Sequence, residues 1–143
     1  MWNVIRNNED AVCFMKQMAN FHDGCLKELT YYSGAYVDKD LAMYPIKDKY
    51  VLRLIIQRQA EHYSMVELEF TGLLRLELIP VDILYTCEIL NADLSMQNGT
   101  IIWCDHRIDD DSYKDGIEVH ATGLRWREIK NRMGESIFYR SVE

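Results

Sequence analysis

The amino-acid sequence predicts an α+β fold, with an N-terminal helix packed on a face or an edge of a mainly antiparallel β-sheet of five to seven strands. One early segment spaces its apolar residues as a helix does, and several later segments alternate apolar and polar residues. Helices and strands do not alternate along the chain, which favours an antiparallel sheet over a parallel one. The 143 residues hold no repeat and no linker-like run, so we expect a single domain over residues 1–143.

The helix is expected to begin after Asn7 or Asn8, since either side chain can accept a hydrogen bond from the first turn. Two acidic residues follow, which suits the positive end of a helix dipole. A stripe at three-four spacing is expected to be buried, and it consists of Ala11, Phe14, Met15 and Met18. The sequence His22-Asp23-Gly24 has turn chemistry and is expected to follow the end of the helix.

Alternation with a period of two predicts strands over residues 50–57, 66–71, 74–78, 90–96, 100–104 and 117–129. Gly72 interrupts one of these runs, and we expect a bulge or bend there instead of a strand end. Pro80 is expected to stop the same run because it has no N–H to donate. Asn98-Gly99 between two alternating runs predicts a tight hairpin. A short second helix is a further candidate over residues 81–87.

Composition excludes several classes of protein. The chain has 16 Lys and Arg against 23 Asp and Glu, a formal net charge of −7, which argues against binding to nucleic acid through its phosphates. No window approaches 18 uninterrupted apolar residues, so we expect no membrane-spanning helix. The N-terminus lacks a basic stretch followed by an apolar one, which predicts no secretory signal and a cytoplasmic location. The four widely spaced cysteines form no Cys-x-x-Cys pair, and we expect free, buried thiols.

Charge is unevenly distributed along the C-terminal third. Five aspartates lie between residues 105 and 115, and a basic run follows between residues 125 and 132. We therefore predict a contact surface for an oppositely charged partner, formed by Asp109, Asp110, Asp111, Asp115, Arg125 and Arg127. For the two arginines there is an equally simple alternative, a cross-strand ladder with Glu118 or Glu128.

Motifs for the familiar chemistries are missing. The sequence has no Gly-x-Gly-x-x-Gly, no P-loop and no Gly-x-Ser-x-Gly, and the acidic run fails the EF-hand spacing. Asp105, His106 and His120 are metal-ligand candidates, but Cys104 and His106 lie too far apart along a strand to be adjacent ligands. His22-Asp23 is interpreted as part of a turn, not as an acid–base pair. We expect no cofactor and no metal.

The segment from Ala19 to Leu29 contains Phe21-His22-Asp23-Gly24, and it resembles a Phe-His-Asp-small-x-apolar motif. The motif occurs near the start of some small bacterial α+β proteins, among them immunity proteins of polymorphic-toxin systems. The resemblance covers 11 of the 143 residues, and Ala19-Asn20 stands where those proteins usually have Trp-Pro. It implies a link from an N-terminal helix to a strand, a protein partner, and a structural role for Phe21, His22 and Asp23.

These observations favour a small non-enzymatic domain that binds another protein or itself. The alternative is a small-molecule- or metal-binding domain, or a hydrolase, with a site formed by His22, Asp23, His106 or His120. A third interpretation is a homo-oligomer assembled through exposed strands, for which the apolar run at residues 73–79 is the indication.

Overall fold

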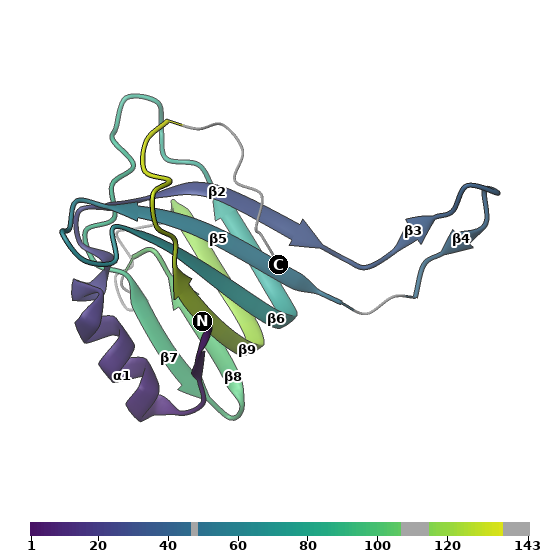
Figure 1. Cartoon of the computed structure of the whole chain (residues 1–143), viewed down its shortest axis with the longest axis horizontal. Coiled ribbons are helices and arrows are strands. Elements are labelled where there is room, and N and C mark those ends of the chain that lie inside the picture. The colour runs from purple at the N-terminus through teal and green to yellow at the C-terminus, as the bar shows by residue number, and fades with distance from the viewer. Residues whose placement is uncertain (47–48, 107–114, 136–143) are drawn as a thin grey trace.

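The structure is a computed structural model that describes residues 1–46, 49–106 and 115–135. It is α+β: one α-helix, α1 (Asn8–Gln17), and a short 3₁₀ helix, η1 (Ala19–Phe21), follow the first strand and pack against a seven-stranded antiparallel sheet (Figure 1). The sheet consists of β1 (Asn3–Ile5), β2 (Gly24–Tyr32), β5 (Val51–Arg58), β6 (Met65–Ile79), β7 (Asp93–Gln97), β8 (Thr100–Cys104) and β9 (Gly116–Glu128). The predicted fold class is confirmed. Within the described chain, no helix is long and apolar enough to cross a membrane.

The strands lie in the order β2-β5-β6-β9-β8-β7, and β1 also pairs with β9. The long strands β6 and β9 are the centre of the sheet and pair over almost their whole length. The sheet curls strongly, so that Gly24 at the start of β2 forms a bridge with Ile89, just before β7. This bridge brings the two outer strands of the order together around the core.

Helix α1 closes the core from one face of the sheet. The Asn7 side chain accepts from the Asp10 N–H at 2.9 Å, which confirms a predicted cap. The predicted buried stripe is also confirmed, since Ala11, Phe14, Met15 and Met18 are all buried. Phe14 lies with its ring centroid 5.0 Å from that of Trp126, and Phe21 packs edge-on at 6.1 Å from Trp103.

A buried arginine joins the end of α1 to the β5–β6 turn. The Arg58 guanidinium donates to the backbone carbonyls of Met18 at 2.8 Å and Tyr63 at 2.9 Å. Burial lowers the pKa of Arg58 below its ordinary value. The carbonyls accept hydrogen bonds from a buried cation, which compensates part of its loss of water. The Arg58 side chain therefore stabilises the packing of α1 against the sheet.

The irregularity predicted at Gly72 is confirmed within a single continuous strand, β6, whose register shifts between Leu73 and Arg75. Gly72 has φ +60°, and a Cβ there would lie 2.0 Å from Thr122 Oγ1 on β9. The hairpin at Asn98-Gly99 between β7 and β8 is confirmed too, and both residues have positive φ. Strand β6 ends at Ile79, directly before Pro80, as expected.

Two expectations about secondary structure were wrong. Residues 81–87 form an irregular segment around a turn at residues 82–85, not a helix: the Asp82 carboxylate accepts from the Leu84 N–H, and Ile83 and Leu84 are 97% and 85% exposed. An Asp side chain that binds nearby backbone competes with a helix, and these apolar residues have no core to pack against. Strand β7 begins at Asp93 instead of residue 90, because Ala92 donates its N–H to Asn20 near α1.

An extension that the sequence analysis did not predict projects from the sheet between β2 and β5 (Figure 1). We call residues 33–46, 49 and 50 the arm. Within it, β3 (Tyr36–Val37) and β4 (Met43–Tyr44) form a two-stranded ribbon, and the rings of Tyr36 and Tyr44 stack at 4.8 Å. The arm carries β3 and β4 away from the body of the molecule.

Candidate functional site

The sheet face opposite α1 carries a ladder of charged side chains, an unusual feature for central strands. Glu67 and Glu69 of β6 are 0% and 3% exposed. Three arginines compensate their charge: Arg53 of β5 bonds to Glu69 at 2.8 Å, Arg125 of β9 bonds to Glu69 at 2.7 Å, and Arg127 bonds to Glu67 at 2.7 Å. We call these five residues the Arg–Glu ladder.

Trp2 covers the β9 side of the Arg–Glu ladder. Its ring lies 4.3 Å from the guanidinium carbon of Arg125 and 4.3 Å from that of Arg127. A stacked guanidinium is attracted to the indole face and loses access to water. The pairing of β1 with β9 places Trp2 here, since Asn3 lies opposite Trp126.

The structure corrects the ladder predicted for the two arginines. Arg125 and Arg127 face Glu69 and Glu67 of β6, because the β6–β9 register places those residues directly opposite. Glu118 lies in the other half of β9, opposite Glu77, and Glu128 alternates to the other face. Whether the arginines also contact a partner stays a prediction. The missed carboxylates had a signal, since Glu67 and Glu69 alternate with apolar residues within one strand.

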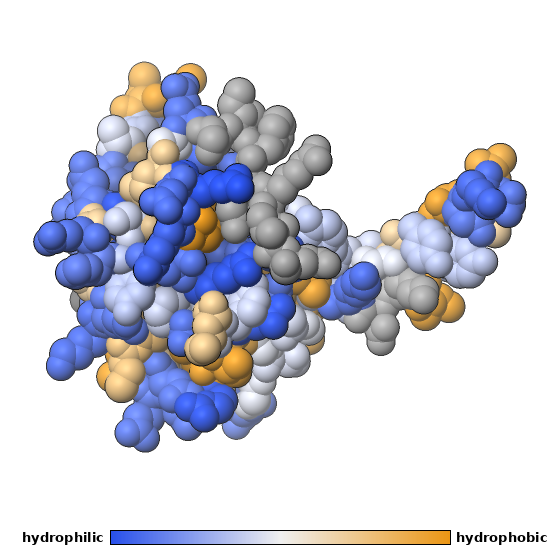
Figure 2. All heavy atoms as spheres, viewed as in Figure 1, coloured by the Kyte–Doolittle hydropathy of each residue, from blue (hydrophilic) through white to orange (hydrophobic). Residues whose placement is uncertain are grey.

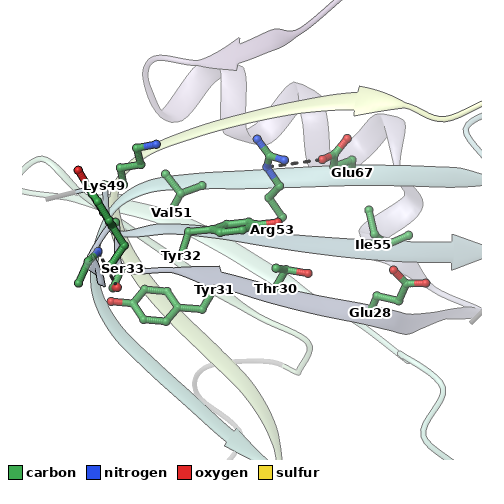
Figure 3. A pocket seen from close by; sticks show the side chains of 13 residues that line it. Glu28, Thr30, Tyr31, Tyr32, Ser33, Lys49, Val51, Arg53, Ile55 and Glu67 are labelled. Carbon is green, nitrogen blue, oxygen red and sulfur yellow. Dashed lines mark hydrogen bonds and ion pairs between the residues drawn. The ribbon is translucent and has the colours of Figure 1, made fainter. Parts of the chain in front are cut away.

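A groove of about 750 Å³ lies on the same face, at the root of the arm (Figure 3). Glu28, Thr30 and Tyr32 of β2 line one wall, and Arg53 and Glu67 lie on the other side. The lining is completed by further residues of β2, the arm and β5, which are Tyr31, Ser33, Gly34, Ala35, Tyr36, Lys49, Val51 and Ile55. The groove therefore connects the arm to the Arg–Glu ladder.

The charges in this groove differ in how well they are compensated. Glu67 Oε1 is buried without a hydrogen-bond partner, 3.8 Å from Arg53 Nε, whose hydrogen is donated to Glu69. Lys49 lies at the mouth of the groove and is exposed. Its backbone N–H donates to Ser33 O at 3.2 Å, which holds the two chains of the arm root together. The groove thus presents a lysine to solvent beside a ladder whose three arginines outnumber its two glutamates.

The arm carries the most exposed group of apolar side chains next to this groove. Val37 is 52% exposed, Met43 69%, Leu41 85% and Ile46 90%. In the space-filling view, apolar side chains gather with polar ones at the end of the arm (Figure 2). Asp38 closes the turn at the tip, because its carboxylate accepts from the backbone N–H groups of Asp40 and Ala42 at 2.9 and 3.0 Å.

The acidic part of the predicted contact surface is described only in part. Asp109, Asp110 and Asp111 lie outside the described residues, and Asp115 is exposed just before β9. The contact role of these four aspartates stays a prediction. Asp105 has a structural role instead, because its carboxylate accepts from the Ile117 N–H at 3.0 Å and supports the start of β9.

The metal-ligand candidates do not converge in the structure. His106 contacts its neighbour Asp105 at 2.9 Å, and His120 contacts Glu118 at 3.1 Å. His120 lies opposite Ile102, four residues from His106, which is a separation of roughly 13 Å along a strand. Among the described residues no three His, Cys, Asp or Glu side chains gather as a metal site would require.

The His22-Asp23 pair lies in the turn between η1 and β2, as predicted. His22 Nδ1 is 2.7 Å from Leu90 O, so its ring joins this turn to the segment before β7. Its Nε2 also approaches Asp23 Oδ1 at 3.5 Å, although both side chains are more than half exposed.

All four cysteines are free, as predicted, but only some are buried. Cys104 is buried and Cys25 half-buried. Cys13 and Cys87 are exposed, so the expectation of burial was wrong for them. Cys13 lies on the outer face of α1, and Cys87 lies in the irregular segment between the turn at residues 82–85 and β7.

Comparison of the chain with protein families, with curated proteins and with solved structures found no match. The function is therefore argued from the geometry of the groove and the arm.

Proposed function

We propose that this chain is a non-enzymatic protein-binding domain that engages its partner through the arm. The observation that carries the proposal is the exposure of Val37, Leu41, Met43 and Ile46 on a ribbon that projects from the body (Figures 1 and 2). A two-stranded ribbon alone is only marginally stable in water, and clustered exposed apolar side chains mark interaction sites. A partner that covers them gains about 25 cal/mol for each Å² of apolar surface removed from water.

An immunity-like role is part of this proposal. The Phe21-His22-Asp23 segment lies between α1 and β2, the kind of link that the resemblance to immunity proteins implies. Its side chains have structural contacts, with Phe21 in the core and His22 against Leu90. A cytoplasmic location belongs to the same proposal, and the exposed free thiols of Cys13 and Cys87 suit a reducing compartment.

The test compares two variants of the full chain that each replace four exposed apolar side chains by polar ones. The arm variant carries Val37→Ser, Leu41→Asn, Met43→Ser and Ile46→Asn. The control variant carries equally exposed positions of the body, which are Val12→Ser, Ile83→Asn, Leu84→Asn and Met133→Ser. Circular dichroism checks that both variants fold.

Tagged wild-type and variant chains are used to retain proteins from a lysate of the native cell, and each retained protein is then purified and titrated back. We expect a protein that binds the wild type and the control equally and the arm variant at least about tenfold more weakly, a change of about 1.4 kcal/mol. An arm variant that binds the same protein equally well overturns the proposal. A wild-type chain that retains no protein, a second copy of itself included, also overturns it.

A further inference from the structure

We propose that the arm binds a second copy of this chain, with the two arms side by side and running in opposite directions. The inference rests on the proposed function, because it names the partner of the same arm. In a two-fold dimer the same patch of each copy contacts its counterpart, so residue i meets j and j meets i. The tip of each arm then lies at the root of the other.

Charge complementarity supports this direction of pairing. The tip carries Asp38 and Asp40 against Lys39, and the root carries Lys49 at the mouth of the groove beside Arg53. Asp40 and Lys49 are both exposed. Antiparallel arms place the Asp40 carboxylate of each copy next to the Lys49 ammonium of the other. Parallel arms would instead bring like charges together, which disfavours them.

The spacing along the arm is consistent with a two-fold axis. Backbone hydrogen bonds join Lys49 to Ser33 at the root and Asp38 to Ala42 at the tip. Asp38 lies five positions after Ser33, which is roughly 17 Å of extended chain. The midpoint lies at the β3–β4 ribbon, where Tyr36 stacks on Tyr44. The axis of the dimer would therefore pass beside this stacked pair.

Backbone and apolar groups of the ribbon support the same pairing. Among the described residues, β3 and β4 pair only with each other, so each ribbon has outer edges with N–H and C=O groups open to a further strand. Two ribbons that meet edge to edge form a four-stranded sheet, and added strands stabilise a ribbon that is only marginally stable alone. Val37 and Met43, which lie opposite one another in the ribbon, gain cross-strand neighbours from the second copy in that sheet.

The expected dimer is of modest affinity. The arm and the groove residues together fall at or below the roughly 20–30 residues a side of a standard interface, so we expect a dissociation constant on the order of micromolar. The net charge of −7 on each copy opposes association further. Dimerisation should therefore depend on protein concentration and strengthen with salt up to the point where the Asp40–Lys49 contact is itself screened.

The test uses charge reversal and sedimentation equilibrium of the full chain over about two decades of concentration around the micromolar range. We expect wild type to form dimers, and Asp40→Lys and Lys49→Asp each to raise the dissociation constant at least about tenfold. Two controls reverse exposed charges of the body with the same change in net charge, Glu61→Lys and Lys130→Asp. Both controls should dimerise as wild type does.

Two rescue measurements make the result specific to antiparallel arms. The double variant Asp40→Lys/Lys49→Asp should regain wild-type dimerisation, since each contact is restored with its sign exchanged. An equimolar mixture of the two single variants should form heterodimers. In one contact of the heterodimer the two introduced side chains meet with opposite charges, and in the other the native Asp40 of one copy meets the native Lys49 of its partner.

A wild-type chain that stays monomeric throughout overturns this inference, and so does a dimer that neither single reversal weakens. A failed rescue overturns the antiparallel pairing of Asp40 with Lys49. The proposed function is decided separately, because a monomeric chain whose arm variant loses a different retained protein still supports it.

Discussion

Arg127 donates a 2.7 Å hydrogen bond from Nε to Glu67 Oε2 across the pairing of β9 with β6. Glu67 is 0% exposed, and only 19% of the Arg127 side chain remains accessible. A buried carboxylate without a cation nearby would take up a proton or destabilise the fold by several kcal/mol. The Arg–Glu ladder is therefore what allows acidic residues to occupy the centre of the strand.

Removing the carboxylate of Glu67 should destabilise the protein strongly. Glu67→Ala deletes the buried anion to which the half-buried Arg127 donates, and we expect the free energy of unfolding to fall by about 3 kcal/mol. Urea denaturation followed by circular dichroism measures it. The matched control is Glu77→Ala on the same strand, where Glu77 pairs with Arg75 on the surface, and there the change should stay within about 0.5 kcal/mol. Similar losses in both variants would contradict this interpretation.

Trp2 should stabilise the fold through its two guanidinium contacts. Trp2→Ala exposes Arg125 and Arg127 to water, and we expect a loss of about 1 to 2 kcal/mol, seen as a lower midpoint in thermal unfolding. Trp2→Phe keeps an aromatic face and should recover at least half of the loss. If Trp2→Phe and Trp2→Ala behave alike, ring stacking is not the cause.

Gly72 should be intolerant of a side chain for two separable reasons. Gly72→Ala introduces a Cβ at φ +60° and 2.0 Å from Thr122 Oγ1, and we expect a loss of at least about 2 kcal/mol. Gly99→Ala is the control for the cost of the backbone conformation alone, since Gly99 has φ +77° but no atom within 4 Å of the added Cβ. Adding Thr122→Ala to Gly72→Ala should return part of the loss. No recovery in that double variant would assign the whole effect to backbone conformation.

The fold class was predictable because its signals are local. The cap at Asn7, the hairpin at Asn98-Gly99 and the irregularity at Gly72 each depend on residues a few positions apart. The prediction that failed at residues 81–87 was local as well: a short helix was a candidate there, but Ile83 and Leu84 have no core to pack against. Periodicity describes a segment and says nothing about what the segment packs against.

The candidate site was harder to predict because it depends on strand order. The partners of Arg125 and Arg127 lie more than 50 residues earlier, and only the β6–β9 register brings them together. The arm was missed for a different reason. Its two strands contain two residues each, too few for alternation to be recognised, and its apolar residues resemble those of a core segment until the structure places them in water.

Cys104 should be chemically protected and should make stability depend on pH. Burial, and then the charges of Glu118, Asp93 and Asp105, raise the pKa of its thiol to about 12. At about pH 8 we expect a thiol reagent to label exposed Cys13 and Cys87 quickly and Cys104 only on unfolding. Fast labelling of Cys104 in the folded protein would contradict its burial.

The sign of the pH effect follows from the same shift. A thiol in the unfolded chain has a pKa of about 8.5, well below the pKa of about 12 in the folded protein. The unfolded state therefore loses the proton first as the pH rises. The stability that comes from keeping Cys104 protonated is complete below about pH 8.5 and decreases as the pH rises towards 12. Cys104→Val removes the titrating group, so the stability of wild type relative to this variant should fall between about pH 8 and pH 10 in parallel urea titrations. Cys13→Val, at an exposed position, is the matched control, and its difference from wild type should stay constant over that range. A constant difference for Cys104→Val as well would mean that the thiol ionises equally in both states, against the burial that the structure gives it.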